Sequence, residues 1–164
     1  MLSEKMESAI NEQINKELYS GYLYLAMAAY LESENLPGFA IWMEQQAKEE
    51  LSHAMKFYAF VNERNGSVVL GAIDKPPAEW DSVLAVFEHA YGHEKKVTGM
   101  IHNLVNMAIE ESDHATRSFL DWYVDEQVEE ESSVNDVVQK LTMIGDSTNG
   151  LFMLDRAMAQ RGAK

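Results

Sequence analysis

Glu50 and His53 are the two residues whose types and spacing in this sequence most plainly allow chemistry. A carboxylate and an imidazole three positions apart lie on the same side of an α-helix. At helical spacing that side also carries Met43, Gln46, Phe57 and Phe60, so it is largely a core face. Burying these two polar groups is costly unless something pairs with them, and a metal ion is one such partner.

Three further segments with helical periodicity carry polar side chains among inward-pointing apolar ones. In the first of them, the polar residue shares a face with Ile10 and Ile14. Glu17, Glu94 and Gln127 lie about eleven to thirteen positions into their segments, so in a bundle they would fall near the middle height, and Glu130 follows Gln127 by three residues. Because they share both face and height, we interpret them as one site with the first pair. The residues are Glu17, Glu94, Gln127 and Glu130.

The charges of this set predict a pair of divalent cations. It holds four glutamates, one histidine and one glutamine, so two divalent cations would balance four negative charges. The chain has 0 Cys, which excludes disulfides and cysteine-ligated zinc. An oxygen-rich set with one imidazole suits iron or manganese better than a structural zinc site.

Two kinds of neighbouring residue are open to more than one interpretation. Tyr24 points inward near Glu17 and could hydrogen-bond a ligand, supply an electron, or simply fill the core. His89 and His93 have an i,i+4 spacing that can chelate a metal. They lie off the stripe that contains Glu94, so we expect them to be partly exposed and not to bind metal.

The acidic residues exceed what one dinuclear site needs. The excess carboxylates Glu49, Glu126 and Glu129 are adjacent to expected ligands. They form either a solvated acidic face or an extra metal site beside the main one.

Apolar periodicity predicts an all-α fold for one domain spanning residues 1–164. On the first helix the spacing points Leu18, Tyr22 or Leu25, and Ala29 inward. A fifth, short helix has an apolar side that would dock on its own bundle or on a neighbouring subunit. The expected helices cover residues of about 6–34, 39–64, 81–110, 114–144 and 147–160.

The connection over residues 65–80 has no helical period and includes a β-like run at 68–70. About 15 extended residues reach about 50 Å, whereas a helix of about 28 residues is about 42 Å long. The connection can therefore travel the full length of the bundle. This predicts a four-helix bundle with one long crossover between its second and third helices.

Charge and hydropathy exclude several functional classes. The formal net charge is −14, from 13 basic and 27 acidic residues, which argues against nucleic-acid binding and favours cationic ligands. The N-terminus has no signal-peptide pattern. The most apolar run, residues 21–31, is well short of the roughly 20 residues that span a bilayer. We expect a cytoplasmic protein that does not bind membranes.

Taken together, these residues resemble the non-haem bacterial and archaeal ferritins over essentially the whole chain. The resemblance implies a ferritin-like fold and a ferroxidase centre with two irons per subunit. One iron would be held by Glu17, Glu50 and His53, and the second by Glu50, Glu94 and Gln127 with Glu130 close by. A third iron position of the bacterial members matches Glu49, Glu126, Glu129 and Glu130. The residues that carry the resemblance are Glu17, Tyr24, Glu49, Glu50, Leu51, Ser52, His53, Glu94 and the stretch 125–130.

The same resemblance implies an activity and an assembly. Ferritins oxidise Fe(II) with dioxygen or hydrogen peroxide and store the Fe(III) as an oxyhydroxide mineral. Their shell is a homo-oligomer of 24 subunits with octahedral symmetry, in which the fifth helix would line the four-fold axis.

Three departures from related families limit what carries over. Bacterioferritins repeat a Glu-x-x-His pair on the fourth helix, where this chain has Gln127 and Glu130. They also place a haem-ligating Met where this chain has Leu51, so we predict no haem. Animal ferritins have acidic three-fold pore residues where this chain has Arg117 and Leu120, so their iron route does not transfer.

Two other functions remain open. One is a di-iron peroxide reductase or oxidase on the same bundle without storage, although the lack of Cys removes the usual rubredoxin electron donor. The other is a helical interaction module whose buried acids only fix its pairing.

Overall fold

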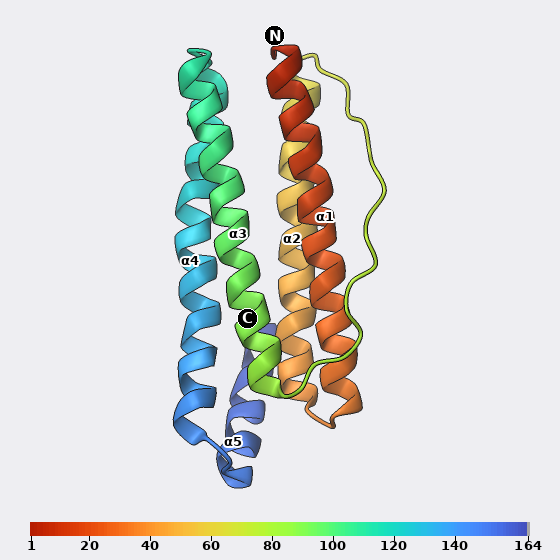
Figure 1. Ribbon diagram of the computed structural model, residues 1–164, viewed down its shortest axis with the longest axis vertical. Helices are drawn as coiled ribbons and strands as arrows, with labels where there is room; N and C mark the ends of the chain where they lie inside the picture. Colours follow the sequence, from red (N-terminus) through yellow and green to blue (C-terminus); the bar gives the residue numbers. More distant parts are fainter. Residues whose placement is uncertain (164) are drawn as a thin grey trace.

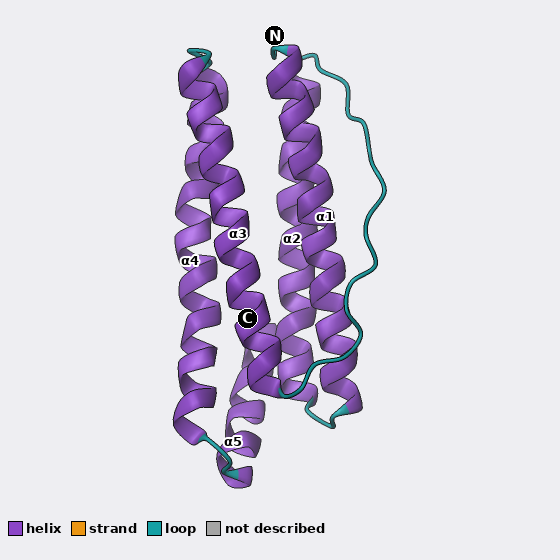
Figure 2. Cartoon of the chain, viewed as in Figure 1, coloured by secondary structure: helices purple, strands orange, loops and turns teal. Residues whose placement is uncertain are grey.

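In a computed structural model, which describes residues 1–163, the chain forms four long helices and one short helix (Figure 1). The four long helices make a bundle, and the described residues contain no strand (Figure 2). The predicted fold class, a four-helix bundle with one long crossover and a short fifth helix, is confirmed. The helices are α1 (Glu4–Ser33), α2 (Pro37–Glu63), α3 (Val83–Glu110), α4 (His114–Ile144) and α5 (Thr148–Met158), followed by the 3-10 helix η1 (Ala159–Ala163).

Side-chain caps fix where four of the five helices begin. The oxygens of Ser3, Ser82, Asp113 and Ser147 each accept a hydrogen bond from a backbone N–H three residues ahead. Such caps satisfy donors that have no partner inside the first helical turn. The exception, α2, has Pro37 in its first turn and no side-chain cap, which suits a residue that lacks a backbone N–H.

The crossover between α2 and α3 runs along the outside of α1 (Figure 1). Two asparagines of α1 fasten it. Asn11 donates from Nδ2 to the carbonyl of Ser67 at 2.9 Å and accepts from the N–H of Val69 at 2.8 Å. Asn15 donates to the carbonyl of Ala72 at 2.9 Å. Because the crossover travels the length of the bundle, α2 and α3 run parallel, and the predicted β-like run at 68–70 is loop.

Two apolar clusters fill the bundle above and below its middle. The upper cluster contains Met6, Ile10, Phe57, Ile101 and Leu120, with others. The lower cluster, nearer α5, includes the following fully buried residues: Leu23, Met27, Leu31, Phe39, Met43 and Phe87.

The inward face predicted for α1 was partly wrong. Tyr22 and Leu25 are 50% and 51% exposed, and Ala29 is exposed as well. The buried residues at this level are instead Leu23 and Met27. The first helix is apolar around most of its circumference here, so periodicity alone could not select the buried face.

The short helix α5 docks on α2 of its own bundle. Asp155 accepts a hydrogen bond from the N–H of Phe39 at 3.0 Å. A Cβ added at Gly38 would overlap the carbonyl of Asp155, so this close approach requires glycine. The opposite side of α5 leaves Phe152 and Met153 exposed by 58% and 74%. None of the described helices combines the length and the apolar character needed to cross a membrane.

Candidate metal centre

A layer of buried polar side chains separates the two apolar clusters at mid-height. All four long helices contribute to it, and every member is at most 4% exposed. Buried polar groups of this number require partners. We call this set the polar layer; it consists of Gln13, Glu17, Gln46, Glu50, His53, Glu94, Gln127 and Glu130.

The first potential metal position lies between α1 and α2. Ligand atoms of Glu17, Glu50 and His53 lie within 4.8 Å of one another. His53 Nδ1 is 3.5 Å from Glu50 Oε2. On the opposite side, Gln13 Nε2 donates to Glu17 Oε1 at 2.8 Å and so holds that carboxylate in place.

The second potential position shares Glu50 with the first. Ligand atoms of Glu50, Glu94 and Glu130 lie within 4.8 Å of one another, from α2, α3 and α4. Gln46 Nε2 donates to Glu130 Oε2 at 2.5 Å and to Glu50 Oε1 at 3.2 Å. The shared carboxylate between two positions is the arrangement that a bridged pair of cations needs.

Tyr24 and Gln127 both contact Glu94. The fully buried Tyr24 hydroxyl donates to Glu94 Oε1. Gln127 Nε2 lies 3.2 Å from Glu94 Oε2 and 3.2 Å from Thr98 Oγ1. The amide nitrogen of Gln127 therefore faces the carboxylate, and a rotation of the amide group would present its oxygen to a cation instead.

A third group extends the site toward α4, with a composition that differs from the expected one. His53, Glu126 and Glu130 have ligand atoms within 4.8 Å of one another, and His53 Nε2 is 3.7 Å from Glu126 Oε1. Glu49 instead accepts a 2.6 Å hydrogen bond from Arg161, and the exposed Glu129 belongs to none of the three groups. Of the three extra carboxylates, the structure brings only Glu126 to the centre.

Burial raises the pKa of every glutamate in the polar layer. For Glu17 the next cause is Glu50, and for Glu50 it is the charge of Glu94. Burial and the charge of Glu94 raise the pKa of Glu130 to about 7. Within the described residues, no lysine or arginine forms an ion pair with these four carboxylates. Burial therefore disfavours the charged form of these carboxylates, and bound cations would favour it.

The donor set fits iron. It is rich in carboxylate oxygen with one imidazole, which suits iron or manganese. In addition, Gln46 Oε1 is buried and has no hydrogen-bond partner among the described residues. A cation, or water bound to one, would satisfy this buried acceptor.

The histidine pair of α3 lies outside these groups. His93 Nε2 is 2.7 Å from the hydroxyl of Ser20, and His89 Nδ1 accepts from the indole N–H of Trp80 at 2.9 Å. Burial, then the neighbouring His89 and Lys96, lowers the pKa of His93 to about 4. Both histidines are partly exposed, as predicted from their place beside the Glu94 stripe.

Sequence reasoning gave no role to the two glutamines that orient the carboxylates. Gln13 lies four residues before Glu17, and Gln46 lies four residues before Glu50. An amide and a carboxylate at i,i+4 on a helix lie within hydrogen-bonding reach. This repeated i,i+4 spacing of a glutamine and a glutamate is the sequence signal that could have predicted their role.

The model of the Ferritin-like domain matches residues 7–144. This chain belongs to the ferritin family. A bacterial non-heme ferritin of Staphylococcus epidermidis is 41% identical over 98% of this chain and 97% of its own. Another from Bacteroides fragilis is 42% identical over 98% of this chain and 100% of its own. The predicted resemblance to non-haem ferritins is confirmed, and iron storage is the function that this membership supports.

Solved ferritin structures have the same fold. An open pore ferritin from the hyperthermophilic archaeon Archaeoglobus fulgidus aligns with a TM-score of 0.96 and 55% identity, over 97% of this chain and 98% of that one. A humanized archaeal ferritin aligns with a TM-score of 0.96 and 54% identity, over 97% and 96% of the two chains.

Proposed function

We propose that this ferritin oxidises Fe(II) to Fe(III) at the polar layer and stores the product as ferric oxyhydroxide mineral. One observation carries the proposal. Four glutamates from four helices are buried together, and none has a lysine or arginine partner among the described residues. Such a concentration of buried carboxylates is strongly unfavourable unless cations balance it.

In this proposal each Fe(II) substrate has its own set of ligands, and Glu50 belongs to both of the first two sets. The first is held by Glu17, Glu50 and His53, which lie within 4.8 Å of one another. The second is held by Glu50, Glu94 and Glu130, joined by Gln127 after rotation of its amide group. A third iron would sit at Glu126 with His53 and Glu130; Glu49 and Glu129 could join it only by moving their side chains.

Oxidation follows from the charge of this ligand set. Each Fe(II) loses one electron, so a pair delivers two electrons to dioxygen or hydrogen peroxide. Carboxylates bind the harder Fe(III) more strongly than Fe(II), which favours the oxidised state. Tyr24 orients Glu94 through its hydroxyl, and it is also placed to supply a further electron.

Storage requires a cage, and we propose an assembly of 24 copies with octahedral symmetry. Five large hydrophobic side chains of α1 and α2 are between 38% and 52% exposed in the single chain. Exposed apolar surface of this extent supports contact with other copies. The residues are Tyr22, Leu25, Leu51, Met55 and Tyr58.

The experiment that tests this function measures iron retained per chain. Excess Fe(II) is added in air, free iron is removed by gel filtration, and iron and protein are assayed in the same peak. Tens of irons per chain in a very large particle are expected for storage. Two or three per chain would favour a di-iron peroxide reductase or oxidase, and none in a small particle would favour an interaction module.

A further inference from the structure

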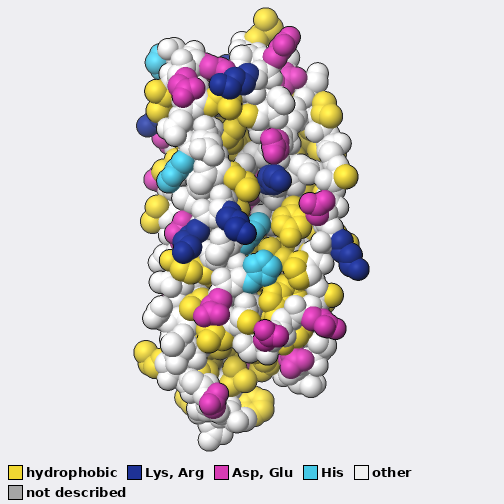
Figure 3. Space-filling model, in the orientation of Figure 1, with side chains coloured by type: hydrophobic (Ala, Val, Ile, Leu, Met, Phe, Trp, Pro, Cys, Tyr) yellow, Lys and Arg dark blue, Asp and Glu magenta, His cyan; other side chains and the backbone are white. Residues whose placement is uncertain are grey.

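A surface pocket of about 240 Å³ opens between α1 and α3. These two helices touch at far fewer positions than α1 and α2 do. A second pocket of about 280 Å³ adjoins the first and shares Lys16 and Met100 with it. Figure 3 looks onto this side of the bundle and shows hydrophobic and basic side chains together near mid-height. The seam between α1 and α3 is therefore hollowed at the level of the polar layer.

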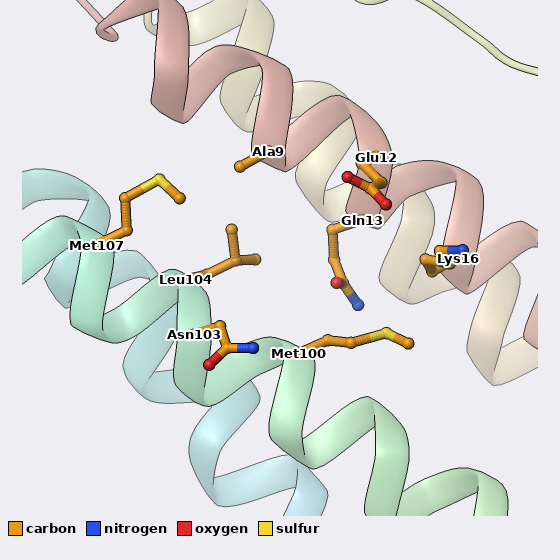
Figure 4. A pocket seen from close by; sticks show the side chains of 8 residues that line it. All are labelled: Ala9, Glu12, Gln13, Lys16, Met100, Asn103, Leu104 and Met107. Atoms are coloured by element: carbon orange, nitrogen blue, oxygen red, sulfur yellow. The ribbon is translucent and has the colours of Figure 1, made fainter.

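Gln13 lies between this pocket and the metal centre. It lines the pocket, and its Nε2 donates to Glu17 Oε1 at 2.8 Å. Figure 4 shows its side chain extending from α1 toward Met100 on α3. Only 4% of Gln13 is exposed, so its amide closes the pocket on the side of Glu17.

The lining of the pocket suits a small uncharged molecule. Met100, Leu104 and Met107 of α3 give it a mainly apolar wall. Glu12 and Lys16 of α1 add one negative and one positive charge, which offset each other. Among the described residues, none of the acidic or histidine groups able to hold a metal lies at this pocket. Methionine side chains are flexible and can move aside for a small guest.

We propose that this pocket admits the small uncharged oxidant, dioxygen or hydrogen peroxide, to the Glu17 side of the centre. Gln13 is the movable partition, because rotation of its side chain breaks one hydrogen bond and opens the pocket toward Glu17. Fe(II) is a hydrated cation and uses another route. The inference rests on the proposed oxidation of Fe(II) and adds where its second reactant arrives.

A filled pocket tests the inference. Asn103 is an exposed residue of α3 that lines the pocket, so Asn103→Trp places an indole across it. Asn106 is an exposed residue of the same helix that lines neither pocket, so Asn106→Trp is the matched control. Because both positions are exposed, neither substitution disturbs the core.

The readout is the rate of Fe(II) oxidation by the assembled protein at several dioxygen concentrations, and separately at several hydrogen peroxide concentrations. Asn103→Trp should lower kcat/KM for the oxidant about tenfold, whereas Asn106→Trp should not change it. The rate and stoichiometry of Co(II) binding, followed by absorbance without oxidant, should be the same in both variants and the wild type. Oxidation by Asn103→Trp at the wild-type rate for all oxidant concentrations would overturn the inference.

Two further results distinguish a failure of this inference from a failure of the proposed Fe(II) oxidation on which it rests. Ala9→Phe fills the same pocket from α1 and should give the same loss of kcat/KM for the oxidant. Slower Co(II) binding in either filled variant, with unchanged dependence on oxidant, would mean that the pocket admits cations and would overturn the assignment. A wild-type chain that neither binds Co(II) nor accelerates Fe(II) oxidation would instead contradict the proposed function itself.

Discussion

The polar layer and the two apolar clusters are carried by the same four helices, yet they bury opposite kinds of side chain. In the upper cluster, Phe57 is fully buried and stacks on Tyr123 with ring centres 4.1 Å apart. Two turns earlier on the same helix, Glu50 is 2% exposed among three other glutamates. Apolar burial stabilises a fold, whereas buried carboxylates oppose it unless cations are bound. The apolar clusters at the two ends of the bundle therefore stabilise the fold and offset the destabilising burial of carboxylates in the polar layer, the proposed metal site.

The largest expected effect comes from removing the carboxylate that two metal positions share. Glu50→Ala should slow Fe(II) oxidation by about 100-fold or more, since loss of even an outer partner of a metal ligand costs about 10–100-fold. Stopped-flow absorbance of Fe(III) formation gives the rate. The apo protein should stay folded, because the variant removes a buried charge. Oxidation at the wild-type rate would show that the reaction occurs elsewhere.

A substitution in the upper cluster should instead lower the stability of the fold. Phe57→Ala should lower the free energy of unfolding of the apo protein by about 3–5 kcal/mol, because it removes a buried ring and leaves a cavity. Urea unfolding, monitored by circular dichroism, measures this value. Glu50→Gln on the same helix is the matched comparison, and its apo stability should equal or exceed that of the wild type. If Glu50→Gln were less stable than the wild type, the contrast between the polar layer and the apolar clusters would be wrong.

The pH dependence of apo stability tests the same contrast. The pKa of Glu130 is about 7 in the folded chain, above its ordinary value of 4.5. Between these values the folded chain binds more protons than the unfolded chain, so stability present at low pH is lost as pH rises through 7. The loss attributable to this group is up to about 3 kcal/mol.

Thermal unfolding of chelator-treated protein between pH 5 and pH 8 measures this loss, and Glu130→Gln should reduce it. Bound Co(II) should reduce it as well, because the cation replaces the proton. A wild type and a glutamine variant with parallel pH profiles would refute the role of Glu130.

The smallest expected effect concerns the third group. Glu126→Gln should slow repeated iron turnover about threefold, because Glu126 lies beside His53 and Glu130 but is a proposed ligand of neither of the first two irons. Glu129→Gln, an exposed neighbour outside all three groups, should have no effect. Oxidation kinetics over successive Fe(II) additions compare the two variants. Equal slowing by both would indicate a general effect of surface charge.

The fold followed from pattern wherever one face of a helix was apolar and the other polar. On α3, Phe87, Ala90, Val97 and Ile101 repeat at helical spacing and all are buried. On α1 the apolar residues surround the helix, so the pattern predicts Tyr22 or Leu25 inward, although they are 50% and 51% exposed. Only packing against α2 and α3 decides which side of such a helix is covered.

The sequence by itself determined the chemical character of the centre. Carboxylates and one imidazole at inward positions of four helices predict a site for two hard cations, because buried charges need partners. The structure brings Glu17, Glu50, His53, Glu94 and Glu130 together.

Only the tertiary structure decided which nearby groups join them. Arg161 pairs with Glu49, more than a hundred residues away in the chain, and Glu49 belongs to none of the groups able to hold a metal. Gln46 reaches Glu130 across the bundle, and Gln13 stands between Glu17 and a surface pocket. Contacts of this kind depend on side-chain directions across helix interfaces, which periodicity along a single helix does not specify.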